Sequence, residues 1–320
     1  MKIKFIAEFC QNHNGDPDVV DRMIDAAVDA GATHLKLQHI YTRNLTNRIA
    51  FETGGLDTAH GHVVISRPYK EELQRLRELE LPEEVCRRFV ERCLDAGVTP
   101  MTTCFCTEHV QALSELGFRE IKVASYDCAS PYLLKSLKGN FDHIYVSTGA
   151  TFDSEIRRAA EILQADYSFL HCVTRYPTPL HALNLNRMDW LTQFVDSVGY
   201  SDHSDANETG TFATRLALHQ GAQIIERHFT ILGRDETKDG RVSVSAEQIS
   251  EILGFSMLER AEQAAQLLKE RPDFEVCLGG AEEFKMSEEE YQNRLYYRGR
   301  FASVKVENGL MRHVYNWEPL

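Results

Sequence analysis

The sequence predicts an α/β protein of the (β/α)8 barrel class, a TIM barrel with a short C-terminal extension. Three observations predict this fold class. Apolar, strand-like runs occur eight times, helical patterns separate most of them, and polar residues follow the end of every run. Alternating strands and helices build a parallel sheet through right-handed crossovers, and eight such units close a barrel.

The expected strands cover about residues 3–9, 33–40, 98–105, 120–125, 143–148, 167–173, 197–203 and 222–230. Helical periodicity is expected over about residues 17–30, 82–97, 107–117, 153–164, 206–221 and 245–270. Several of these segments begin with Pro, Asp or Thr and end at Gly, as helix termini tend to do. An open doubly wound sheet is the rival fold, but no glycine-rich nucleotide motif follows any strand.

Residues 1–270 are expected to form the barrel and residues 271–320 the extension. The extension is too short for an independent domain, so we expect a strap that packs on the barrel or on a partner subunit. Residues 41–80, which contain AHGH and KEELQRLRELE, interrupt the alternation. This insertion is either a lid over the strand ends or a solvated excursion.

Composition limits the classes of function. The net charge of −13 disfavours nonspecific binding to nucleic acid or anionic membrane. No apolar run approaches the roughly 18 residues of a membrane span, and Glu8 follows too early for a signal peptide, so a soluble cytoplasmic protein is expected. The eight cysteines include a C-x-C pair, Cys104 and Cys106, which predicts free thiols rather than a redox or zinc motif.

In a barrel the active site lies at the carboxyl ends of the strands. The polar residues expected there are Glu8, Lys36, Gln38, Thr103, Lys122, Ser125, Asp127, Ser147, Thr148, Thr174, Arg175, Tyr176, His203 and His228. Lys36 and Lys122 supply charges for a phosphate or carboxylate, and Ser125, Ser147, Thr148 and Ser201 supply hydroxyl donors. Glu8, Asp127 and Asp239 are candidates for proton transfer or for binding sugar hydroxyls; alternatively, each pairs with a neighbouring lysine.

Two segments, GYSDHS at 199–204 and IERHFT at 225–230, each end a strand-like run on a histidine. Strand alternation places Ser201 on the face of His203, and Glu226 on the face of His228. Two imidazoles on neighbouring strand ends suit an open, catalytic Mn, Co, Fe or Zn site. The alternative is a pair of hydrogen-bonded histidines without a metal.

The ordered motifs IAEFCQNHNGD, LKLQ, TTCFC, IKVAS, VSTGA, HCVTRYPTP, GYSDHS and IERHFT resemble the sialic acid synthase family from about residue 3 to 250. Members condense phosphoenolpyruvate with an aldose. The resemblance implies a homodimeric barrel with a divalent metal, usually Mn2+, on His203 and His228; Mg2+, Co2+, Fe2+ and Zn2+ are the alternatives. It places phosphoenolpyruvate among Lys36, Thr103, Lys122, Ser125, Ser147 and Ser201.

The resemblance also assigns the acceptor side of the site. Gln38, Asp127, Tyr176 and Asp239 face the sugar or the attacking water, Glu8 orients the site, and the acceptor contacts are Asn12, Phe105, Thr174 and Arg175. The implied reaction joins C3 of phosphoenolpyruvate to the metal-polarised aldehyde. Water then adds to C2, and phosphate leaves with C–O cleavage.

Three departures from the family pattern concern the acceptor. Asp127 replaces a common Glu, and Thr174-Arg175 replaces a common Asn, so Arg175 either binds an extra anionic group or faces solvent. The family usually carries a C-terminal antifreeze-like domain that brings an arginine to the partner's site, and here only the linker-like YYRGRFAS stretch and about twenty further residues remain. Either the acceptor differs, or Arg298, Arg300 or Arg312 reaches the site.

Other functions stay open at this point. A related synthase that makes a 3-deoxy-ulosonic acid phosphate from a phosphorylated aldose would use Arg175 as the phosphate ligand. A metal-dependent sugar isomerase or epimerase needs bases beside the metal, but gives no reason for two lysines. A barrel without activity that binds a sugar or a protein is the alternative outside enzymes.

Overall fold

The computed structural model describes residues 3–57, 62–280 and 284–320. Eight parallel strands close into a barrel in the order β1-β10-β9-β8-β7-β6-β5-β2, which confirms the predicted fold class. The barrel strands are β1 (Lys4–Cys10), β2 (His34–Gln38), β5 (Thr99–Thr103), β6 (Glu120–Val123), β7 (His143–Ser147), β8 (Tyr167–Cys172), β9 (Val198–Asp202) and β10 (Ile224–His228).

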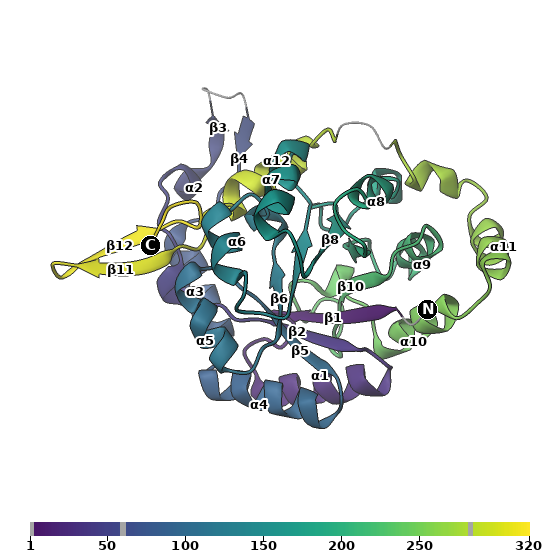
Figure 1. Ribbon diagram of the computed structural model, residues 1–320, viewed down its shortest axis with the longest axis horizontal. Coiled ribbons are helices and arrows are strands. Elements are labelled where there is room, and N and C mark those ends of the chain that lie inside the picture. The colour runs from purple at the N-terminus through teal and green to yellow at the C-terminus, as the bar shows by residue number, and fades with distance from the viewer. Residues whose placement is uncertain (1–2, 58–61, 281–283) are drawn as a thin grey trace.

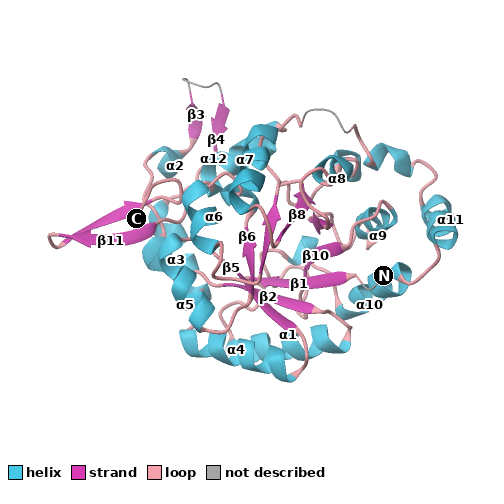
Figure 2. Ribbon diagram, in the orientation of Figure 1, coloured by secondary structure: helices cyan, strands magenta, loops and turns pink. Residues whose placement is uncertain are grey.

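Helices surround these strands (Figure 2). They are α1 (Pro17–Asp29), α4 (Glu83–Asp95), α5 (Val110–Glu115), α6 (Pro131–Leu137), α7 (Asp153–Leu163), α8 (Arg187–Leu191), α9 (Phe212–His219), α10 (Ala246–Ser256) and α11 (Arg260–Glu270). In α1, the Asp16 side chain accepts the backbone N–H of Asp18, and Pro17 occupies the first turn, where its missing N–H costs nothing.

Two helix predictions were wrong at their boundaries. The segment 245–270 is not one helix, because Glu259 has an extended backbone and its N–H donates to the Glu262 side chain, which starts a second helix. The segment 206–221 becomes helical only at Phe212. The Asp205 carboxylate accepts the N–H groups of Asn207 and Glu208, and this local turn competes with the first helical turn.

Alternation along the strands divides the barrel interior into layers. Ile6, Met101, Tyr145, Leu170 and Ile224 pack together as one buried cluster inside the barrel. The strand residues between these positions point outward and join the larger core beneath the helices. Side chains two positions further along each strand, such as Glu8 after Ile6, therefore point inward at the carboxyl end, where the polar residues gather.

The insertion and the tail both lie over this carboxyl end. The insertion contains α2 (Ala50–Thr53), β3 (Gly55–Asp57), β4 (His62–Val64) and α3 (Tyr69–Leu79), and most of its AHGH motif falls outside the described residues. The tail contains α12 (Glu288–Tyr297) and the hairpin of β11 (Ser303–Glu307) and β12 (Leu310–Val314), which extends outward in Figure 1.

Ion pairs and hydrogen bonds tie the tail to the barrel. Arg300 pairs with Glu72 of α3, and Arg294 pairs with Glu155 at 2.6 Å. After β12, Asn316 donates to the Phe105 carbonyl and to Asp127 at the strand ends, and tail residues before β11, such as Tyr297 and Arg300, line the pocket described below. In the described part of the chain no helix is long and apolar enough to cross a membrane.

A partly buried hydrogen-bond network lies at the opposite end of the barrel. Glu120 accepts the Tyr145 hydroxyl at 2.6 Å and contacts His34 Nε2 at 3.2 Å. The Lys4 ammonium donates to the Tyr145 oxygen at 2.7 Å. Burial alone would raise the pKa of Glu120, but the hydrogen bonds of His34 and Tyr145 lower it to about 2. This carboxylate therefore stabilises the fold in its charged form.

Replacing Glu120 with Gln should lower the free energy of unfolding by about 1–2 kcal/mol at pH 7. The folded-state pKa of Glu120, about 2, lies below the ordinary value of 4.5. Its stabilisation is therefore complete above the ordinary pKa and is lost as the pH falls toward 2. Urea denaturation at pH 7 and pH 3 measures the difference, which should shrink in acid.

Glu161→Gln is the matched control, because Glu161 is an exposed carboxylate on α7 that pairs with Arg158. It should change the free energy of unfolding by less than about 0.5 kcal/mol. A difference between wild type and Glu120→Gln that stays constant from pH 7 to pH 3 would contradict the account of this network.

Candidate active site

A pocket of about 410 Å³ opens at the carboxyl end of the barrel. Its wall combines strand ends with residues from the insertion and the tail. The predicted site residues that line it are Glu8, Lys36, Gln38, Thr103, Phe105, Lys122, Ser125, Asp127, Ser147, Tyr176, Ser201, His203, His228 and Asp239. The barrel geometry therefore brings together side chains that are more than 200 residues apart in the sequence, from Glu8 to Asp239.

A buried carboxylate, Glu226, lies between two buried lysines. Its oxygens are 3.1 Å from Lys36 Nζ and 3.5 Å from Lys122 Nζ. The Ser201 hydroxyl donates to the same carboxylate at 2.7 Å. Burial alone would raise the pKa of Glu226, but Lys122, Lys36 and the Ser201 hydrogen bond lower it, so Glu226 is ionised.

Each lysine has further partners. Lys36 pairs with Glu8 and donates to the Thr103 hydroxyl at 3.0 Å. Lys122 donates to the Ser147 hydroxyl at 2.6 Å and to the backbone carbonyl of Val123 at 3.0 Å. Burial lowers the pKa of Lys36 to about 8, although the charge of Glu226 opposes this shift. The two lysines, Glu8 and Glu226 form a charge-balanced network, and hydroxyl groups border it.

The two predicted metal histidines lie side by side, with ring centroids 5.3 Å apart. His203 Nδ1 is 3.3 Å from the Val173 carbonyl oxygen, and the Tyr176 ring packs on His203 with centroids 4.2 Å apart. Burial, reinforced by His228, lowers the pKa of His203 to about 3, and burial also lowers the pKa of His228. Both imidazoles are therefore neutral at pH 7, as metal ligands must be.

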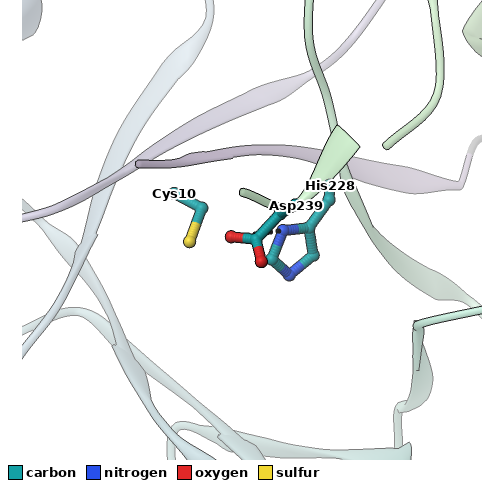
Figure 3. A group of neighbouring side chains, drawn as sticks. All are labelled: Cys10, His228 and Asp239. Atoms are coloured by element: carbon teal, nitrogen blue, oxygen red, sulfur yellow. Dashed lines mark ion pairs between the residues drawn. The ribbon is translucent and has the colours of Figure 1, made fainter. Parts of the chain in front are cut away.

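The donor groups near His228 fit a divalent metal ion. Its Nδ1 is buried without a hydrogen-bond partner and lies 3.8 Å from a carboxylate oxygen of Asp239. Among the described residues, donor atoms of Cys10, His228 and Asp239 all lie within 4.8 Å of one another. Figure 3 shows the Asp239 carboxylate between the Cys10 sulfur and the His228 ring. An imidazole, a carboxylate and a thiol together form a typical transition-metal donor set.

Asp127 is a buried carboxyl group at the edge of the pocket. It accepts the Ser130 hydroxyl at 3.1 Å and the side-chain N–H of Asn316 at 2.8 Å. Burial raises its pKa to about 6, even though both hydrogen bonds act in the opposite direction. Asp127 can therefore exchange a proton near neutral pH. Its partner Asn316 belongs to the tail, which thus contributes to this side of the site.

A second group of cations lies at the rim, and of these only Arg300 was predicted from the sequence to reach the site. Arg67 from the insertion, Lys238 and Arg300 all line the pocket. Burial and the positive charges of Arg75, Arg300 and Arg67 lower the pKa of Lys238 to about 8. The rim is therefore strongly positive, in a chain with a net charge of −13.

Other pocket residues also escaped sequence reasoning. Glu226 was predicted to share a strand face with His228 but was given no role. Its position two residues before His228 already indicated that its side chain points toward the same site. Gln11, Tyr126, Cys172, Asn293 and Tyr297 also line the pocket. Gln11, Cys172 and Tyr297 lie within the motifs IAEFCQNHNGD, HCVTRYPTP and YYRGRFAS, but no residue pattern indicated a role for them.

Four predicted residues do not line the pocket. Asn12 donates to the Phe229 carbonyl and the Ser243 hydroxyl, both at 2.9 Å, and so joins two strand-end loops. The Thr148 hydroxyl donates to the Leu170 carbonyl at 3.2 Å.

Thr174 and Arg175 contact the tail instead. The Thr174 carbonyl accepts the Asn293 side chain at 2.8 Å, and Arg175 pairs with Glu289. Of the three tail arginines considered above, Arg300 lines the pocket. Arg298 pairs with Glu155 at 3.2 Å, and Arg312 is exposed and lies 3.5 Å from Glu318.

Comparison with known proteins identifies the family. A family model described as "NeuB family" matches residues 23–270. An N,N'-diacetyllegionaminic acid synthase of Campylobacter jejuni is 30% identical over 78% of this chain and 73% of its own length. A pseudaminic acid synthase of the same organism is 27% identical over 97% of this chain and 84% of its own length.

A solved structure supports the same assignment. The N-acetylneuraminic acid synthetase of Leptospira borgpetersenii superposes with a TM-score of 0.67 at 25% identity, covering 93% of this chain and 92% of that chain. These matches confirm the resemblance to sialic acid synthases. The chain is therefore an enzyme of the NeuB family.

Proposed function

We propose that this enzyme condenses phosphoenolpyruvate with an aldose to give an ulosonic acid of the sialic acid type and inorganic phosphate. The observation that carries the proposal is the buried network of Lys36, Lys122, Glu8 and Glu226 beside two neutral histidines. The names of the relatives support the same class of product.

The lysine network supplies the proposed site for phosphoenolpyruvate. Lys36 and Lys122 would pair with its anionic groups, and the hydroxyls of Thr103, Ser147 and Ser201 lie where they can donate to the same groups. A close ion pair near the protein surface is worth about 4 kcal/mol at an effective dielectric constant of about 20. Glu226 offsets part of this attraction, so product phosphate can also leave.

The proposed metal site includes His203 and His228. The Val173 carbonyl favours a proton on His203 Nδ1, which leaves Nε2 with a free electron pair. A divalent ion bound there supplies Lewis-acid polarisation of the acceptor's carbonyl oxygen. The resemblance implies Mn2+, and Mg2+, Co2+, Fe2+ and Zn2+ remain alternatives.

Asp127 is our candidate for moving protons. A new bond joins C3 of phosphoenolpyruvate to the aldehyde carbon, and the protonated form of Asp127 would give its proton to the aldehyde oxygen. Water then adds to C2 and returns a proton to Asp127. The tetrahedral intermediate becomes a ketone as the C–O bond breaks, and phosphate leaves with the proton of the C2 hydroxyl. The pKa of Asp127, about 6, suits it to accept the proton of that water. Tyr176, which packs on His203, covers the reacting groups from one side.

The rim cations favour one acceptor class over the others. Arg67, Lys238 and Arg300 would attract an anionic group on the far end of an open-chain sugar. This observation supports a phosphorylated aldose, the second synthase considered above, with Lys238 and Arg300 in the role first given to Arg175. A neutral N-acyl hexosamine would offer no anionic group to Arg67 and Lys238, whereas Arg300 already pairs with Glu72. A sugar isomerase would also leave the lysine network unexplained.

The oligomeric state, the cellular location and the domain boundary remain predictions. The homodimer and the cytoplasmic location follow from the resemblance and the composition, and the boundary between a barrel at 1–270 and an extension at 271–320 follows from the sequence pattern. Sedimentation analysis of the purified chain measures the oligomeric state.

Purified protein with phosphoenolpyruvate, Mn2+ and a suitable aldose should release phosphate, and the product should be heavier than the aldose by one pyruvate unit. A panel of neutral, N-acylated and phosphorylated aldoses identifies the acceptor class. A chelator should abolish release, and added Mn2+ should restore it. Absence of phosphate release with every aldose and metal ion tested would count against the proposal.

Lys122→Ala should raise the KM for phosphoenolpyruvate at least about tenfold, because one buried ion pair with the substrate is lost. The KM for the aldose should change much less. Lys138→Ala is the control, because Lys138 is a solvent-facing lysine that donates to Gln164 at 2.7 Å, away from the pocket. Equal increases in both KM values would argue against this assignment of Lys122.

Lys238→Met should reduce the preference for phosphorylated over neutral aldoses at least about tenfold, since it removes one rim charge and keeps most of the unbranched side chain. The KM for phosphoenolpyruvate should stay near the wild-type value. In Arg175→Ala the acceptor preference should be unchanged, because Arg175 pairs with Glu289 outside the pocket. A shift in Arg175→Ala without one in Lys238→Met would restore the original prediction.

A further inference from the structure

We propose that Cys10 is a thiolate ligand of the metal ion, and that Cys10 and Asp239 join His203 and His228 in a mixed sulfur, nitrogen and oxygen site. The inference rests on the proposed function only in placing a divalent ion beside His228. It adds two ligands and the class of metal that they select.

The three side chains come from neighbouring places at the barrel mouth. Cys10 ends β1, His228 ends the adjacent strand β10, and Asp239 follows in the loop after β10. Their donor atoms lie within 4.8 Å of one another, and His228 Nδ1 is 3.8 Å from Asp239. Donors that share a first-row metal ion are separated by roughly 3–4 Å, since each bond is about 2.0–2.3 Å long. Small side-chain rotations would therefore complete the site.

The backbone at Cys10 is shaped to place this side chain. Cys10 has a positive φ of 49°, which is uncommon for a residue other than glycine. The pairing of β1 with β2 shifts between Glu8 and Cys10, as in a β-bulge. The Cys10 N–H donates to the Glu8 carboxylate at 2.6 Å and fixes this conformation. Bulges at strand ends commonly redirect a side chain next to an active site.

The loop that carries Asp239 is also held firmly. The Ser243 hydroxyl donates to the Asp239 carbonyl at 2.7 Å, and Asn12 donates to the Ser243 oxygen at 2.9 Å. Gly240 packs so closely on the Arg234 carbonyl that a Cβ atom would overlap it. Asn12, two residues after Cys10, therefore positions the Asp239 loop against the end of β1.

The site has one open side. His228 and Asp239 line the pocket, whereas Cys10 lies behind them and is 6% exposed. An ion held by these protein ligands would keep its pocket-facing side free for substrate, as in catalytic metal sites. His228 Nδ1 is buried without a hydrogen-bond partner, so a ligand is needed there to satisfy it.

The sulfur ligand determines the class of metal. Thiolate disfavours Mg2+, and affinity should rise from Mn2+ through Fe2+ to Co2+ and Zn2+. One other thiol could mimic this behaviour. Cys172 lines the pocket, and its sulfur is 3.6 Å from His203 Nδ1. A test must therefore separate Cys10 from Cys172.

Cobalt titration of the full-length, chelator-treated protein makes this distinction. Co2+ bound to a thiolate gives a sulfur-to-metal charge-transfer band in the near ultraviolet, and calorimetry measures affinity in parallel. The wild-type protein and Cys172→Ser should both show the band. Cys10→Ser should lose it and bind Co2+ at least about tenfold more weakly. Asp239→Asn should keep the band but require more Co2+, because the sulfur ligand remains and the carboxylate ligand is lost. This second variant tests the ligand set even if Cys10→Ser fails to fold.

The outcomes separate this inference from the proposed function. Co2+ binding without a charge-transfer band, or a band lost in Cys172→Ser and retained in Cys10→Ser, would overturn the role of Cys10 and leave the synthase proposal intact. Absence of Co2+ binding to the wild-type protein would overturn both the ligand set and the proposed metal site. Phosphate release, measured separately, tests the reaction itself.

Discussion

The ionised Glu226 carboxylate between Lys36 and Lys122 is the interaction on which the pocket depends. Two buried ammonium groups repel each other and lose hydration, so a protein interior holds them only with a carboxylate in contact. Closure of the barrel makes this contact, because it brings β2, β6 and β10 to one layer of inward-facing side chains. Every proposed step takes place next to this charge-balanced group of lysines and carboxylates.

The pocket has three chemically different parts. The lysine network suits a small, multiply anionic substrate, and the donors around His228 suit a divalent ion. The rim, with Lys238 and Arg300, suits an anionic group at the far end of the acceptor. The proposed function assigns the first two parts to phosphoenolpyruvate and to the metal ion. The rim belongs to the insertion, the loop after β10 and the tail, where acceptor selectivity among related enzymes can vary without disturbing the barrel.

Sequence patterns predicted the features that strand geometry controls. The eight strands and the inward position of Lys36 follow from alternation and from the parallel order of the barrel. The rim residue Arg67 and the contact of Asn316 with Asp127 could not be predicted, because both depend on how the insertion and tail fold back. The same limit applied to Arg175, since no local signal indicates that it pairs with the tail.

The fate of the bridging oxygen of phosphoenolpyruvate tests the central claim most directly. Phosphoenolpyruvate labelled with ¹⁸O between C2 and phosphorus is incubated with the enzyme, metal ion and acceptor, and both products are analysed by mass spectrometry. We expect all of the label to appear in inorganic phosphate, because water attacks C2 and the C–O bond breaks. Label retained in the sugar acid would mean attack at phosphorus, and would contradict the proposed use of this pocket.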